Sequence, residues 1–231
     1  MDERGATVMA VLGKGGAGKT AFCALAARSL IDLGAGPLLL VDADPTGGLA
    51  WAVGAGMEHT VGAIREHLIR EAAGPDTDRG TLAGQIDWMA LEALQERQGY
   101  SLLAMGRSED RGCYCPLNSL LREAIGKLAA GFAHVVLDAE AGIEQVNRQV
   151  FRRVDLPVVV TDGSVRGMQV VWQLSGLLGR YGLAGRIGLV LNRAERLPQD
   201  PPAGLSFWGR VPEDDMVRAC DQAGSSLLEL P

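Results

Sequence analysis

The chain has 231 residues, of which 47% are hydrophobic and 22% charged, a composition that is typical of soluble globular proteins and excludes a disordered chain. Its formal net charge of −6 argues against a protein that mainly neutralises nucleic-acid phosphates, because that task needs clustered lysine and arginine. No apolar run approaches the ~20 residues of a membrane span, and residues 1–4 lack the start of a signal peptide. We therefore expect a cytoplasmic protein with no membrane anchor and no nucleic-acid partner.

The N-terminal part has the pattern of a strand, a glycine-rich loop, a helix and a second strand. Residues 7–12 are apolar and partly β-branched, and apolar residues then recur at helical spacing as far as Leu33. Residues 37–44 are a continuous apolar run that ends in acids, as in a strand buried on both faces of a parallel sheet. Further strands are predicted at 101–105, 134–138, 157–161, 186–191 and 205–208.

The segments between these strands mostly have helical periodicity, which favours parallel strands joined by right-handed helical crossovers. Residues 58–99 are richer in charged residues and contain a Gly/Pro/Asp connection at 74–80. We expect them to form a helical insertion over the edge of the sheet. The whole chain, 1–231, is predicted to be a single domain.

The strongest motif lies at residues 13–20, which read Gly-Lys-Gly-Gly-Ala-Gly-Lys-Thr. Gly13, Gly18, Lys19 and Thr20 fill the phosphate-loop pattern between a predicted strand and a predicted helix. Such a loop turns backbone N–H groups toward phosphate oxygens, while Lys19 reaches the β- and γ-phosphates and the Thr20 hydroxyl ligates Mg²⁺. The expected ATP/ADP-binding residues of this segment are Gly13, Gly15, Gly16, Ala17, Gly18, Lys19, Thr20 and Ala21. The predicted fold class is thus an α/β P-loop NTPase with a mainly parallel central sheet and helices on both faces.

Acidic residues end two of the predicted strands, at the edge where α/β proteins place their ligands. Asp138 follows residues 134–137 and is expected to hold Mg²⁺ through water, as the second magnesium motif of P-loop enzymes does. Asp42 and Asp44 follow the apolar run of the second strand, and an acid there can also simply cap the next turn.

A pair of cysteines, Cys113 and Cys115, precedes Pro116 at the start of a predicted helix, a location that favours thiolates. Two thiolates are half of a tetrahedral S₄ site, so the same pair from a second chain would be needed to complete it. From spacing alone, small apolar fillers are an equally good interpretation.

Residues 14–20 resemble the deviant phosphate loop of the MinD, ParA, ArsA and nitrogenase iron-protein group. The resemblance implies an ATP-dependent homodimer in which Lys14 crosses to the partner's nucleotide, so that Lys14, Lys19 and Asp44 are catalytic and Asp44 positions the attacking water. It also places Asp42 near the magnesium shell. Further nucleotide contacts that it implies are the switch glycine Gly142 and, around the purine, Asn192, Arg193, Pro212 and Glu213.

Residues 105–122 and 138–144 are similar to the CooC-type nickel-insertion ATPases of carbon monoxide dehydrogenase. That resemblance implies an ATP-hydrolysing dimeric metallochaperone with Zn²⁺ or Ni²⁺ between the Cys113 and Cys115 pairs of two chains. The client would be apo-carbon monoxide dehydrogenase or a related nickel enzyme such as acetyl-CoA synthase. Soft thiolates also accept Fe–S clusters, so an Fe–S carrier or reductase-like ATPase is an alternative, and a MinD/ParA-like positioning switch is another.

Overall fold

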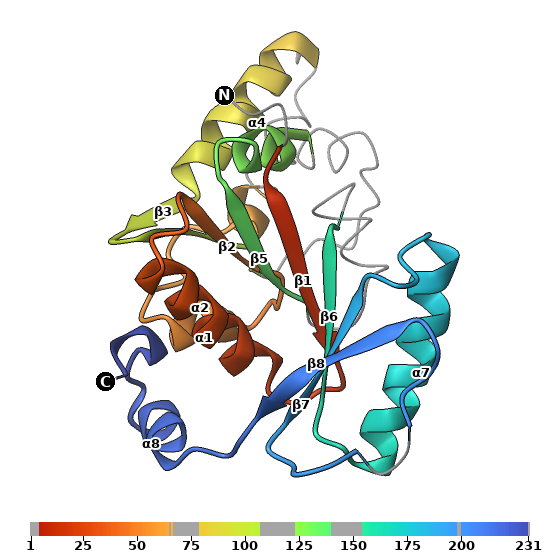
Figure 1. Cartoon of the computed structure of the whole chain (residues 1–231). Helices are drawn as coiled ribbons and strands as arrows, with labels where there is room; N and C mark the ends of the chain where they lie inside the picture. Colours follow the sequence, from red (N-terminus) through yellow and green to blue (C-terminus); the bar gives the residue numbers. More distant parts are fainter. Residues whose placement is uncertain are drawn as a thin grey trace.

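The computed structural model describes residues 5–64, 66, 79–106, 123–139, 154–197 and 200–230, and within them an eight-stranded sheet runs through the centre (Figure 1). The strand order is β3-β4-β2-β5-β1-β6-β7-β8, and only the β3/β4 pair is antiparallel. The strands are β1 (Thr7–Gly13), β2 (Leu38–Asp42), β3 (Leu94–Arg97), β4 (Tyr100–Ala104), β5 (His134–Asp138), β6 (Leu156–Thr161), β7 (Ile187–Asn192) and β8 (Leu205–Val211).

The helices cover both faces of this sheet, which confirms the predicted fold class (Figure 1). Alternate residues of β1 and β2 divide between two buried clusters: Ala10 and Leu39 lie in one, Val11 and Leu40 in the other. The first cluster packs against α4 (Arg79–Glu92), α7 (Val165–Arg180) and helical residues 123–129. The second packs against α1 (Lys19–Asp32), α2 (Gly48–Ala52) and the C-terminal 3₁₀ turn η1 (Leu227–Glu229).

Helix α8 (Asp215–Ala223) has no fully buried residue and lies next to η1 near the C-terminus (Figure 1). Arg28 of α1 holds the chain end, because its guanidinium donates to the carbonyl oxygens of Leu228, at 2.8 Å, and of Leu230. No helix in the described part of the chain is long and apolar enough to cross a lipid bilayer.

The two edges of the sheet differ from our sequence predictions. We expected residues 58–99 to be helical, but Leu94–Arg97 forms the antiparallel edge strand β3, which pairs with β4. At the other edge, β8 runs three residues beyond the predicted 205–208 and ends at Val211. Its register shifts opposite Leu189 and Val190, where Trp208 has no partner on β7.

Candidate nucleotide site

The phosphate loop connects β1 directly to α1 at the carboxyl end of the central strand. Gly13, Gly16 and Gly18 have φ values of 145°, 76° and 90°, a region that L side chains rarely adopt. At Gly13 a side chain is also blocked by contact, since an added Cβ would lie 2.2 Å from the Val160 carbonyl oxygen. Lys19 begins α1 and is 9% exposed. The strand, loop and helix predicted for this motif are therefore all present.

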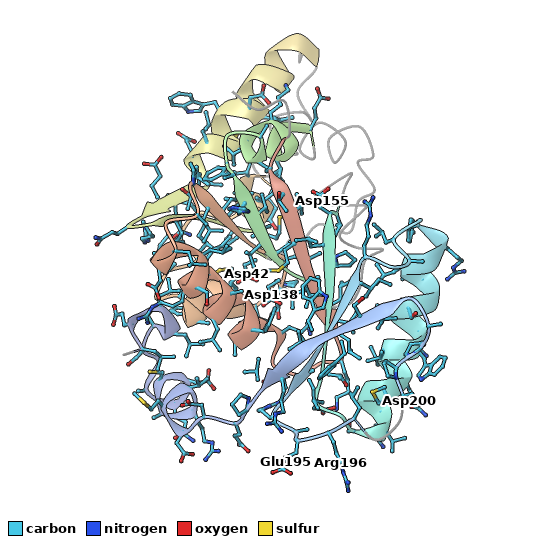
Figure 2. The ribbon with its side chains drawn as sticks, in the orientation of Figure 1. Asp42, Asp138, Asp155, Glu195, Arg196 and Asp200 are labelled. Carbon is cyan, nitrogen blue, oxygen red and sulfur yellow. The ribbon has the colours of Figure 1, made fainter. Side chains whose placement is uncertain are left out.

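An acidic and hydroxyl cluster lies beside the loop, because β2 and β5 are neighbours and their register places Asp42 opposite Asp138 (Figure 2). The Thr20 hydroxyl donates to Asp138 Oδ2 at 2.6 Å. Burial raises the pKa of Asp138, although the Thr20 hydrogen bond and the charge of Lys19 oppose the shift. A hydroxyl and a carboxylate in contact are the hard oxygen ligands that Mg²⁺ prefers, so Thr20 and Asp138 fit a magnesium ion at the phosphates.

Asp42 is fully buried, and backbone groups occupy both of its oxygens. Oδ1 accepts the N–H of Asp44 at 3.0 Å, and Oδ2 accepts the N–H of Ala50 at 2.8 Å. Burial raises the pKa of Asp42 to about 6, with the two N–H groups opposing the shift and the charges of Asp138 and Asp44 adding to it. Asp42 thus ties together both ends of the loop that carries Asp44.

Asp44 lies half-buried in that loop and lines the cleft beside the phosphate loop. Its Oδ1 accepts hydrogen bonds from the backbone N–H and the hydroxyl of Thr46, at 2.8 and 2.7 Å. These contacts cap the turn and fix one oxygen of the carboxylate. The sequence predicted the position of Asp44, whereas the turn that orients it is visible only in the structure.

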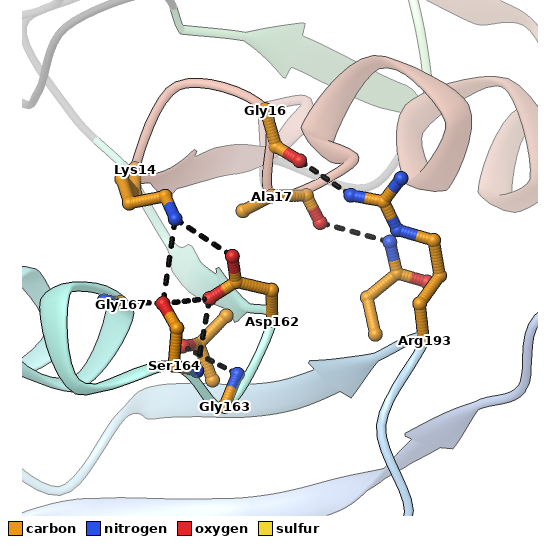
Figure 3. A network of polar contacts seen from close by, with 10 residues as sticks. Lys14, Gly16, Ala17, Asp162, Gly163, Ser164, Gly167 and Arg193 are labelled. Carbon is orange, nitrogen blue, oxygen red and sulfur yellow. Dashed lines mark hydrogen bonds and ion pairs between the residues drawn. The ribbon is translucent and has the colours of Figure 1, made fainter.

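The second lysine of the loop, Lys14, extends away from the phosphate loop toward the junction of β6 and α7 (Figure 3). Its ammonium contacts Asp162 Oδ2 at 2.7 Å and Ser164 Oγ at 3.3 Å. Partial burial opposes ionisation of Asp162, but the hydrogen bonds from Lys14 and Ser164 outweigh it and lower the pKa of Asp162 to about 2. Sequence reasoning missed both partners; the only signal was a polar Thr-Asp-Gly-Ser run directly after a buried strand.

Two residues at the end of β7 contact the phosphate loop from the other side (Figure 3). Asn192 Nδ2 donates to the Ala17 carbonyl oxygen at 2.8 Å, and the Arg193 guanidinium donates to the carbonyl oxygen of Gly16. We expected both residues near the purine. The structure places them at the phosphate loop as well as along the cleft.

A cleft of about 1170 Å³ opens beside these groups, which is ample for a nucleotide. The phosphate loop, Asn192 and Arg193 form one end, together with Pro212 and Glu213. The rest lies between α1, α2, α8 and the chain end. The structure thus brings together the predicted loop, Asp44 and the purine-side residues along one cavity, while Asp42 and Asp138 are buried and do not line it.

Three predicted site residues, Cys113, Cys115 and Gly142, lie outside the described residues. Among those that are described, no group of three or more His, Cys, Asp or Glu side chains could hold a metal ion. Cys23 is buried on α1, and burial, followed by the charges of Asp138 and Asp42, raises the pKa of its thiol. Cys23 is therefore a core thiol and not a ready metal ligand.

The sheet order, the phosphate loop and the adjacent acids together define a P-loop nucleotide-binding protein with the fold of the MinD/ParA-type ATPases. Solved structures share this fold. A ParA family ATPase from Chlorobium tepidum has a TM-score of 0.69 at 21% identity, over 97% of this chain and 91% of that one. The septum site-determining protein MinD of Pyrococcus horikoshii, complexed with Mg-ADP, has a TM-score of 0.63 at 20% identity, over 96% and 87%.

Sequence comparison defines the family more closely, although no family model matches the chain. The chain is 35% identical to an uncharacterized ATP-binding protein of Methanocaldococcus jannaschii, over 97% of this chain and 91% of the relative. It is 31% identical to the carbon monoxide dehydrogenase accessory protein CooC of Rhodospirillum rubrum, over 96% and 89%. The chain belongs to the family of ATP-binding proteins that contains these relatives, and it shares the fold of the MinD/ParA-type P-loop ATPases.

Proposed function

We propose that this protein is a homodimeric ATPase that uses ATP hydrolysis to insert nickel into carbon monoxide dehydrogenase or a related nickel enzyme. The observation that carries the dimeric ATPase is the direction of Lys14. Its ammonium is 2.7 Å from Asp162 and Lys14 does not line the cleft, whereas Lys19 lines the cleft and is buried at the start of α1. A lysine held away from its own nucleotide cleft is suited to serve the nucleotide of a second copy.

In the proposed reaction, water attacks the γ-phosphorus and the bond to the β–γ bridging oxygen breaks. The bridging oxygen and its electron pair leave with ADP, and the phosphate keeps the water oxygen and both of its protons, one of which passes to solvent at neutral pH. Bound Mg²⁺ would neutralise charge on the β- and γ-oxygens, with Thr20 and Asp138 holding it. Asp44 orients the water, and its turn with Thr46 limits the positions that its carboxylate can take. Lys14 of the partner would stabilise the charge that develops on the transferred phosphoryl group, as an arginine finger does.

The nickel part of the proposal rests on the likeness to CooC, whose name makes it an accessory protein of carbon monoxide dehydrogenase. It also rests on Cys113 and Cys115, which would give four thiolates in a dimer. Thiolates bind nickel, zinc and Fe–S clusters alike, so the choice of nickel rests on the likeness to CooC and not on the ligands.

One purification with two assays tests the proposal. We expect the protein, purified without oxygen and saturated with Mg-ATP, to bind one nickel or zinc ion per dimer and to activate apo-carbon monoxide dehydrogenase with nickel. Changing Cys113→Ser and Cys115→Ser together should remove the metal and the activation while nucleotide binding remains. Cys220→Ser is the matched control, because Cys220 is a partly exposed thiol on α8 that lies away from this pair in the sequence.

Different results would favour the alternatives. A brown dimer that contains iron and sulfide would replace nickel delivery with Fe–S transfer. Retained metal in the double variant would rule out the shared cysteine site. ATP-dependent binding to DNA or vesicles, without any effect on the apo-enzyme, would support a positioning switch.

A further inference from the structure

We propose that Asn192 and Arg193, at the end of β7, form a brace that holds the phosphate loop in its nucleotide-binding shape and links it to the purine site. This role goes beyond contact with the base, which is what we expected of the two residues from sequence. The inference rests on nucleotide binding by the phosphate loop and needs neither hydrolysis nor nickel delivery to be correct.

The two side chains hold adjacent carbonyl groups of the loop (Figure 3). Asn192 Nδ2 lies 2.8 Å from the carbonyl oxygen of Ala17, and the guanidinium of Arg193 donates to that of Gly16. The contacts join parts of the chain that are 175 and 177 positions apart. The loop is therefore fixed by β7 as well as by its own strand and helix.

Peptide geometry explains why holding a carbonyl affects phosphate binding. The C=O and N–H of a trans peptide unit point in opposite directions because the unit is planar. When Asn192 binds the Ala17 carbonyl, the N–H of Gly18 must point away from Asn192, toward the inside of the loop where phosphate oxygens bind. Gly18 itself permits this approach, since a Cβ there would lie 2.1 Å from Asn192 Nδ2.

The backbone of Arg193 supports the same interpretation. Arg193 has φ 58°, the only positive φ of a non-glycine residue in the described part of the chain. Non-glycine residues held in the left-handed region are strained and cluster at functional sites. Arg193 is exposed, so burial does not impose this conformation. Its N–H instead donates to the Val211 carbonyl at 2.9 Å, and the turn brings the guanidinium back to the loop.

Asn192 also has an unused group for the link to the base. The side chain is 7% exposed and lines the cleft, and no described residue donates to its Oδ1. A buried acceptor without a protein partner needs a donor from water or from a ligand, and a group that lines the cleft is open to both. Because the Ala17 carbonyl fixes which side of the amide carries the NH₂, Oδ1 is presented as an acceptor that suits a 6-amino purine. A base that binds there would steady the amide that holds the loop.

The test separates contact with the base from bracing of the loop by using a ligand that has no base. We would measure the affinity of each variant for Mg-ATP and for Mg-tripolyphosphate by calorimetry. Arg193→Gly removes the guanidinium and relieves the left-handed backbone, and it should bind both ligands about tenfold more weakly. Asn192→Ala should lose about tenfold for tripolyphosphate and more for ATP. Arg210→Ala is the control, because Arg210 is an exposed arginine whose side chain bonds only the Glu195 carbonyl among the described residues.

Weaker tripolyphosphate binding in both variants, with unfolding temperatures close to that of the control, supports the brace. Wild-type affinity for tripolyphosphate in either variant would overturn it and leave only a base contact. If Arg193→Ala were weakened but Arg193→Gly were not, strain rather than the guanidinium would explain the loss, and the brace would again be wrong. Wild-type protein that binds both ligands but does not hydrolyse ATP would count against the proposed ATPase cycle and not against this inference.

Discussion

The pairing of Lys14 with Asp162 makes a quantitative prediction for dimer formation. If Lys14 must reach the partner's nucleotide, it must first leave Asp162. Asp162→Asn removes the negative charge but keeps Oδ1, which accepts hydrogen bonds from the backbone N–H and hydroxyl of Ser164. The substitution therefore frees the lysine and preserves the start of α7.

The size of the effect follows from burial. The side chains of Lys14 and Asp162 are 30% and 24% exposed, and desolvation offsets the stronger attraction of a partly buried pair, so the range of exposed pairs, about 0.2–1 kcal/mol, sets the scale. We take about 1 kcal/mol as the cost of breaking the Lys14–Asp162 ion pair in each protomer. A dimer releases two such lysines, so the gain is about 2 kcal/mol, or about thirtyfold in the dimerisation constant.

Sedimentation velocity in Mg-ATP, together with ATPase rate against protein concentration, would measure this change. We expect the half-maximal concentration of Asp162→Asn to fall about thirtyfold relative to wild type. Asp87→Asn is the control, because it removes an exposed ion pair between Asp87 on α4 and Lys127 on helical residues 123–129. A lower maximal rate with unchanged dimerisation would refute the reasoning, since Asp162 would then aim Lys14 in the dimer instead of restraining it in the monomer.

Three further predictions concern stability and binding. In the folded protein the pKa of the Asp42 carboxyl is raised to about 6, so the folded state binds a proton on Asp42 more tightly than the unfolded chain does. The stability that comes from this proton is fully present below about pH 4 and is lost as the pH rises through about 6. In urea unfolding without Mg²⁺, the free energy of unfolding should therefore fall by about 1 kcal/mol between pH 5 and pH 7 through Asp42 alone. Asp42→Asn should remove this part of the pH dependence, and an unchanged pH dependence would show that another group titrates. Gly18→Ala should weaken Mg-ATP binding more than tenfold, because the new Cβ would displace the Asn192 amide; near-normal affinity in calorimetry would contradict the geometry. Arg28→Ala should lower the free energy of unfolding by about 1–2 kcal/mol and speed hydrogen exchange at η1, and protection equal to wild type would show that Arg28 does not hold the chain end.

The strands were predictable wherever burial on both faces produced an uninterrupted apolar run. All five residues of β2 and four of the five in β5 are buried, and both strands match their predicted ranges closely. β3 was missed because Leu94–Arg97 has one apolar residue, so its sequence carries no strand signal. Pairing with β4 across the turn at Gly99, where φ is 87°, makes it a strand. Its conformation is a product of tertiary contact.

In the site too, the parts formed by neighbouring residues could be predicted from sequence, and the contacts between residues far apart in the chain could not. The phosphate loop could be predicted because its parts lie within eight consecutive residues: glycines that act through backbone geometry, and Lys19 and Thr20 that act through their side chains. Its outer contacts could not, because Asp162 is 148 positions from Lys14 and no local pattern distinguishes an acid that caps a helix from one that also binds a lysine. For Asn192, sequence suggested a ligand contact but gave no sign of the second bond to Ala17.

The two irregular edges of the sheet restrict how copies of this protein can meet. Open strand edges normally invite another sheet to pair, which leads to continuous intermolecular sheets and aggregation. Here β3 is four residues long and ends in Glu96 and Arg97, while the extra residue at Trp208 twists β8 out of register. Strand addition is disfavoured at both ends. Extension of the sheet by a second copy is thus disfavoured, which directs self-association to other surfaces, the nucleotide-binding face among them.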